Sequence, residues 1–148
     1  MALMAFASAS VTAAQAFACE GAPSATKLTV EVRGVRSPKG EMVVTVYPDD
    51  PGRFLAHKGK LLRVRTPTKA PATSACFYLP KAAYYAVAVY HDENGDHDFN
   101  RTIVGLPAEG FAFSNDPSTK TGLPSFKSVR FEAKGGDTNI HVTLRYLK

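Results

Sequence analysis

The sequence contains no Trp, so the aromatic part of any hydrophobic core has to come from its nine Phe and six Tyr. Helical periodicity is scarce, and there is no internal repeat or low-complexity tract. The Gly-x-Ser-x-Gly motif of many serine hydrolases is also missing. What remains is a chain of 148 residues, 45% hydrophobic and 21% charged, which is typical of one soluble globular domain.

A concentration of positive charge is lacking as well. The formal net charge is +5, but the Lys and Arg residues are scattered along the chain, and no RNA-recognition signature accompanies them. We therefore expect a solvated basic surface and no nucleic-acid partner. A glycan, lipid or protein partner in the cell envelope stays open.

The first 18 residues carry no charge and end in Ala16-Phe17-Ala18, an A-x-A pattern at which signal peptides are cleaved. The initial Lys or Arg of an ordinary signal peptide is missing. The stretch is too short and too rich in small residues for a membrane span. These features predict a signal peptide over residues 1–18 and one domain over residues 19–148. We expect the mature chain to be periplasmic or secreted, with no transmembrane segment.

The two cysteines, Cys19 and Cys76, both fall in the predicted mature chain, 57 positions apart. An oxidising compartment favours their pairing, which would stabilise the fold by about 4 kcal/mol in the chain-entropy model. The alternative is a lipid-modified Cys19, which would leave Cys76 unpaired.

Alternation of apolar and polar residues predicts seven short strands. They cover residues 28–33, 42–46, 62–65, 76–79, 84–91, 126–133 and 138–147. Turn residues at Ser37–Gly40 and Lys134–Asp137 predict hairpins between the first two and the last two strands. These features together predict an all-β, two-sheet sandwich of the immunoglobulin-like or transthyretin-like kind.

Two parts of this predicted sandwich differ from an ordinary strand or turn. Residues 84–91 are apolar on both faces, which indicates a central strand. The irregular stretch that follows, residues 92–125, is too long for an ordinary connection, and such loops tend to be functional.

Oxygen-bearing side chains alternate at the start of this long loop, and one more carboxylate follows after Gly105-Leu106-Pro107. They are Asp92, Asn94, Asp96, Asp98, Asn100 and Glu109. Ca²⁺ takes six to eight oxygen ligands, and a compact loop can supply them at alternate positions. Clustered carboxylates without a cation would repel one another. The spacing therefore predicts a structural calcium site.

Other interpretations of the loop remain open. It is no EF-hand, because Gly95 stands at position 4 and Ile103 replaces the closing Glu at position 12. Asp, Asn and Gly also favour turns, so a solvated turn without metal is an alternative. His91 and His97 beside the carboxylates would suit zinc or copper, although His91, on an apolar strand face, is better explained as a hydrogen-bonded structural residue.

Two motifs in the central region resemble a bacterial family, the domain-of-unknown-function family numbered 2141. The first is Tyr-Ala-Val-Ala-Val-Tyr-His-Asp-Glu-Asn at residues 85–94. The second is Gly-Leu-Pro-Ala-Glu-Gly-Phe-Ala-Phe-Ser-Asn at residues 105–115, and Pro124-Ser125-Phe126 also fits. Ala82 and Ala83 depart from the Gly usual before the Tyr. The resemblance implies an exported β-sandwich and no particular reaction.

Three classes of function follow from these residues. The first is a non-enzymatic exported module with a calcium-stiffened loop, and we favour it. The second is a carbohydrate- or lipid-binding envelope module that uses exposed aromatic residues near Phe111 and Phe113. The third is a hydrolase that uses Glu109 or His91.

Overall fold

Eight strands and one short helix are present in the part of the chain that the computed structural model describes, residues 18–103 and 105–147. Residues 1–17 of the predicted signal peptide lie outside these ranges. The elements are β1 (Thr26–Arg33), β2 (Glu41–Pro48), β3 (Leu62–Pro67), β4 (Thr73–Leu79), β5 (Ala83–Asp92), β6 (Phe111–Phe113), α1 (Phe126–Val129), β7 (Phe131–Ala133) and β8 (Gly136–Thr143). The prediction of an all-β chain is confirmed.

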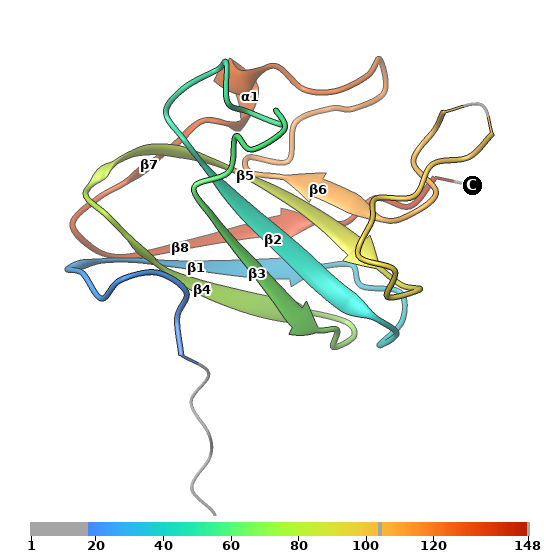
Figure 1. Cartoon of the computed structure of the whole chain (residues 1–148), viewed down its shortest axis with the longest axis horizontal. Helices are drawn as coiled ribbons and strands as arrows, with labels where there is room; N and C mark the ends of the chain where they lie inside the picture. The colour runs from blue at the N-terminus through green and yellow to red at the C-terminus, as the bar shows by residue number, and fades with distance from the viewer. Residues whose placement is uncertain (1–17, 104, 148) are drawn as a thin grey trace, which may run out of the picture.

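The strands form two stacked sheets (Figure 1). Sheet A has the order β4-β1-β8, in which β8 runs parallel to β1. Sheet B has the order β3-β2-β5-β6, and β7 pairs with the first residues of β5. Because β5 has partners on both sides, the prediction of a central strand is confirmed.

The main core lies between the sheets and follows directly from the alternation in the sequence. Leu28, Val30 and Val32 of β1 are fully buried and meet residues such as Val44 and Val87 from sheet B. A second apolar cluster covers the outer face of sheet B; it contains Tyr47, Ala86, Phe111, Phe113 and Val129. Both faces of sheet B are therefore covered, as the two apolar faces of β5 predict.

Both predicted hairpins are wrong. β1 lies in sheet A and β2 in sheet B, and likewise β7 lies in sheet B and β8 in sheet A. The connection over residues 34–40 crosses between the sheets instead of turning back within one. Alternation tells which face of a strand is buried but not which sheet it joins, because both sheets bury their inner faces in the same core.

The region after residue 92 contains more regular structure than predicted. Within the long irregular stretch, β6 pairs with β5. The predicted strand over residues 126–133 begins as the helical turn α1, whose N-cap Ser125 accepts a hydrogen bond from the Ser128 backbone N–H. Ser at this position is a common helix start signal. The alternation of Val129 and Phe131 with polar residues nevertheless favoured a strand over the whole segment.

The predicted disulfide is present and joins Cys19 to Cys76 in β4. Next to it, the Glu20 N–H donates to the Cys76 carbonyl at 2.9 Å, and the Tyr78 N–H donates to the Glu20 carbonyl at 2.7 Å. The N-terminal segment is therefore held to the edge of sheet A by a covalent bond and two backbone hydrogen bonds.

Candidate metal centre in the acidic loop

The acidic loop begins at Asp92, the last residue of β5, and returns to the same strand end at Glu109. The chain is brought back because the His91 N–H donates to the Gly110 carbonyl at 2.8 Å, and β6 then pairs with β5. Gly110 fits there because the Tyr146 ring occupies the space where a Cβ would lie, 2.4 Å from the nearest ring carbon. Glu109 is thereby fixed beside Asp92.

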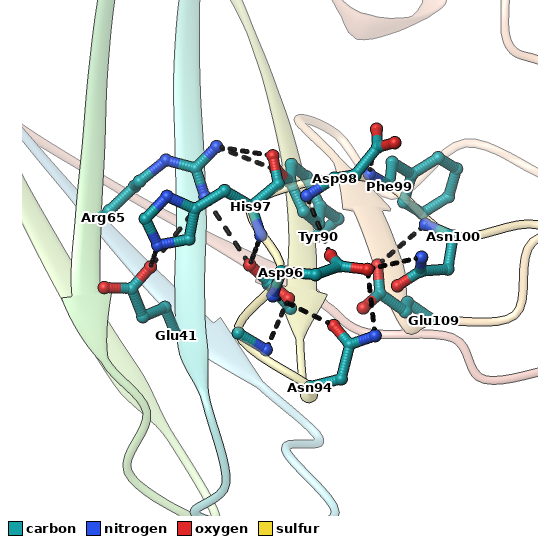
Figure 2. A network of polar contacts seen from close by, with 12 residues as sticks. Glu41, Arg65, Tyr90, Asn94, Asp96, His97, Asp98, Phe99, Asn100 and Glu109 are labelled. Carbon is teal, nitrogen blue, oxygen red and sulfur yellow. Dashed lines mark hydrogen bonds and ion pairs between the residues drawn. The ribbon is translucent and has the colours of Figure 1, made fainter.

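Three carboxylates meet at this strand end. One oxygen from each of Asp92, Asp96 and Glu109 lies within 4.8 Å of the other two. Asp92 is 0% exposed and Glu109 is 5% exposed, whereas Asp96 is on the surface. Figure 2 shows the Asp96 and Glu109 carboxylates turned toward each other, with Asn94 and Asn100 beside them. Such a group is an oxygen-lined site of the type that hard cations prefer.

Hydrogen bonds from backbone and side-chain groups of the loop satisfy two of these carboxylates. Asp92 accepts from the Gly95 and His97 N–H groups, both at 2.9 Å. Asp96 accepts from the Asp98 N–H at 2.9 Å and from the Asn100 side-chain amide at 2.8 Å. The Asp98–Asp96 bond is an Asx turn, and the others are further local bonds of the kind that Asp and Asn make in loops. By themselves they do not call for a metal.

Glu109 is different from the other two. Its Oε2 accepts from the Asn100 N–H at 3.1 Å, but its Oε1 is covered from solvent and has no hydrogen-bond partner among the described residues. The Oδ1 of Asn100 is likewise covered and without a partner. A buried acceptor that lacks a partner costs about 1–3 kcal/mol. A hydrogen-bond donor or a cation beside these two oxygens would remove that cost.

Glu109 and Asp96 differ in their affinity for protons. Burial raises the pKa of Glu109 above its ordinary value of 4.5, and the nearby Asp92 and Asp96 carboxylates raise it further. Hydrogen bonds from the Asn100 amide and the Asp98 N–H hold the pKa of Asp96 below its ordinary value of 3.8. The ionised form of Glu109 is therefore disfavoured without a cation, whereas that of Asp96 is favoured.

This pKa gives a signed prediction for the metal-free protein. A carboxyl whose folded pKa is raised contributes stability that is present below its unfolded pKa and is lost as pH rises through the folded pKa. We expect Glu109→Gln to lose this pH dependence. As pH rises above 4.5, the wild type should lose stability through Glu109 and the variant should not, so the variant becomes more stable relative to the wild type. Urea unfolding from pH 4 to 8 with EDTA measures the difference. The prediction fails if the free energy of unfolding of Glu109→Gln minus that of the wild type stays constant or falls as pH rises.

The other predicted ligands are placed less uniformly. The Asn94 side-chain amide donates to Asp96 at 3.0 Å, and so its role here is to hold that carboxylate. The Asp98 carboxylate points away from Asp96 and Glu109 (Figure 2) and accepts the Phe99 N–H at 2.9 Å. Strict alternation thus brings Asp92, Asp96 and Asn100 together but leaves Asp98 outside the group.

Among the described residues, neither His91 nor His97 belongs to this group. His97 is exposed, and its Nε2 lies 3.4 Å from Glu41. His91 is fully buried, with Nδ1 2.8 Å from the Tyr146 hydroxyl and Nε2 2.7 Å from the Lys39 carbonyl. Because a carbonyl only accepts, Nε2 carries a proton, and His91 is the structural histidine expected from its strand face. The hydrolase alternative needs His91 or Glu109 in an open cleft, yet both are buried.

Arg65 and Glu41 belong to this neighbourhood, although no sequence motif contains them. Arg65 Nη2 donates to the His97 carbonyl at 3.3 Å and to the Tyr90 hydroxyl at 3.1 Å. Its Nη1 lies 3.7 Å from Asp92 and 3.9 Å from Glu41. Arg65 therefore ties the loop to sheet B and offsets part of its negative charge. The cross-strand register, which places Glu41 opposite Asp92, would have indicated this neighbourhood, but it is known only from the folded sheet.

The fold and this loop define a two-sheet β-sandwich domain with an acidic loop at the end of its central strand. The chain belongs to the family described as "Uncharacterized protein conserved in bacteria (DUF2141)", whose model matches residues 30–141. That range runs from β1 to β8 and includes the whole acidic loop. The resemblance seen in residues 85–115 is confirmed. Comparisons with curated proteins and with solved structures gave no match.

Two further observations bear on location and on the alternative functions. The described residues include no helix with the length and apolarity needed to cross a membrane. Phe111 and Phe113 are only 8% and 6% exposed. Their burial argues against an aromatic binding platform made of these two residues.

Proposed function

We propose that this protein is an exported, non-enzymatic β-sandwich module whose acidic loop, residues 92–109, binds one structural Ca²⁺. The single observation that carries the proposal is Glu109 Oε1, a covered acceptor without a partner beside Asp92 and Asp96. Without a cation, ionised Glu109 is both desolvated and repelled by its neighbours. A divalent cation removes both costs at once.

The donor set favours calcium over zinc or copper. The proposed ligands are Asp92, Asp96 and Glu109 through carboxylate oxygens and Asn100 through its amide oxygen. All four are hard oxygen donors, and water would complete the six to eight ligands that Ca²⁺ takes. Zinc and copper prefer imidazole or thiolate. Both nitrogens of His91 are engaged, His97 lies outside the described carboxylate cluster, and both cysteines are in the disulfide.

An exported location agrees with this proposal. The Cys19–Cys76 disulfide forms and persists in oxidising compartments. Extracellular calcium modules bind with dissociation constants of about 10⁻⁴ to 10⁻³ M, so a site of three carboxylates and one amide needs only ordinary millimolar calcium. The ion would act as a clip that fixes the loop to the end of β5.

Calcium titration of thermal unfolding tests the proposal. A ligand that binds only the folded state at a free concentration about 100-fold above its dissociation constant stabilises that state by about 2.7 kcal/mol. For a domain of this size we expect a rise in Tm of roughly 10 °C at about 10–100 mM calcium and a smaller rise at about 1 mM, both reversed by EDTA. Glu109→Gln and Asp96→Ala should abolish the rise.

Asp98→Asn is the matched control, because Asp98 lies in the same loop but points away from the cluster. It should keep the calcium-dependent rise in Tm. Magnesium at equal concentration should shift Tm less, since Mg²⁺ demands a tighter octahedral geometry. A wild-type Tm that does not respond to calcium would refute the metal site and leave the loop as a set of Asx turns.

A further inference from the structure

A hollow of about 270 Å³ lies on the outer face of sheet B, away from the three carboxylates. Its floor is one cross-strand row in which Arg63, Thr45, Ala88 and Phe113 stand side by side on β3, β2, β5 and β6. The two middle residues of the row are small, while Tyr90 in the next row is large. The hollow therefore results from the short side chains of Thr45 and Ala88 in a face that is otherwise largely aromatic.

Three connections between strands raise walls around this floor. Phe99 of the acidic loop stacks edge-on against Tyr90, with ring centroids 5.4 Å apart. Leu55 and Leu123 come from the other two connections and are 38% and 67% exposed. These exposed Leu side chains on the rim of the hollow hold apolar surface in contact with water. A ligand with an apolar body would cover that surface.

The charge around the hollow has one sign. Its lining includes two cations, Arg63 and Arg101, and no carboxylate. Arg63 donates to the Thr45 hydroxyl at 2.9 Å, and Arg101 donates to the Gly105 carbonyl at 3.2 Å and lies over the Phe99 ring. Across residues 18–103 and 105–147 neither guanidinium forms an ion pair. Each keeps N–H groups for an anion.

We propose that this hollow binds a small amphipathic anion, a carboxylate attached to an acyl chain or an aromatic ring. The apolar body lies over Ala88 between Phe99 and Leu123, and the carboxylate pairs with Arg101 or Arg63. The lining positions a few polar groups around a mainly apolar surface, as small-molecule sites do. None of the proposed metal ligands lines the hollow, but Phe99 and Arg101 flank Asn100, so binding is measured both with EDTA and with calcium.

Binding of matched probes tests the proposal. Octanoate and 2-naphthoate are compared with their neutral counterparts, 1-octanol and 2-naphthol, on the purified disulfide-bonded protein, by calorimetry and by amide chemical shifts. We expect at least one of the two anions to bind about ten times more tightly than its neutral counterpart, as one charge-assisted contact predicts. Preference between the two anions tells acyl from aromatic ligands. The shifted amides should include Thr45, Ala88 and Phe99.

Two variants with exposed side chains localise the site without threatening the fold. Leu123→Glu places a negative charge on the rim and should abolish anion binding, whereas Leu147→Glu, on an exposed residue outside the hollow, should leave it unchanged. Arg101→Gln and Arg63→Gln are compared, and one of them should weaken the anions about tenfold and not the neutral probes. The proposal fails if neither anion binds at a few millimolar, if the neutral probes bind equally, or if both Glu variants lose binding alike.

Discussion

Replacement of both Cys19 and Cys76 by Ser is expected to lower the free energy of unfolding by about 4 kcal/mol. The disulfide closes a loop of 57 residues, and the chain-entropy model assigns this cost to the larger conformational freedom of the unfolded chain without the crosslink. The whole free energy of unfolding of an ordinary domain is about 5–15 kcal/mol, so this loss is a large part of it. The double variant should therefore be close to unfolding at 37 °C, and urea unfolding at 25 °C measures the loss.

Reduction of the wild-type protein is the matched control for this loss. A thiol reductant should lower wild-type stability to that of the double Ser variant and should leave the variant itself unchanged. The two backbone hydrogen bonds of Glu20 to β4 should weaken along with the crosslink, because the N-terminal segment is then free to leave the sheet edge. Amide exchange at Tyr78 reports this. A difference below about 1 kcal/mol between oxidised and reduced protein would contradict the entropic account.

The sequence predicted which residues are buried far better than it predicted which strands are neighbours. Leu28, Val30 and Val32 alternate with polar residues and are all fully buried. The same pattern suits a hairpin and a crossing between sheets equally well, because in both arrangements one face of each strand meets the core. Strand pairing depends on contacts such as β1 with β8, which are distant in the sequence, and a local pattern carries no information on them.

The candidate site shows the same division. Alternation at Asp92 and Asp96 and the motif around Glu109 were enough to predict the carboxylates that meet at the end of β5. The orientation of Asp98 was not predictable, since it depends on the turns of the folded loop. Arg65 reaches the loop from β3, two strands away in sheet B. No sequence pattern marks a contact that exists only once the sheet has formed.

Gly40 is the residue on which the fold and the proposed metal site both depend. It has φ +65°, and a Cβ at this position would lie 1.9 Å from the Asp92 carbonyl oxygen. The left-handed conformation costs a non-glycine residue about 1–2 kcal/mol, and overpacking against the backbone costs about 1–3 kcal/mol more. Gly40→Ala is therefore expected to destabilise the protein by about 3 kcal/mol, which denaturant unfolding with EDTA measures.

Gly136→Ala separates the effect of the backbone contact from that of conformation alone. Gly136 has φ +89°, but nothing lies within 4 Å of its Cβ position, so only the conformational cost of about 1–2 kcal/mol applies. Because Gly40→Ala forces β2 away from Asp92, it should also reduce the calcium-dependent rise in Tm, which Gly136→Ala should retain. Equal losses of stability in the two variants would mean that the backbone contact adds nothing to the conformational cost. The ends of β2 and β5 could then move apart without a loss of stability. The backbone of Asp92 would then not be held by Gly40, and the position of this carboxylate would have to be fixed by the hydrogen bonds of its own loop.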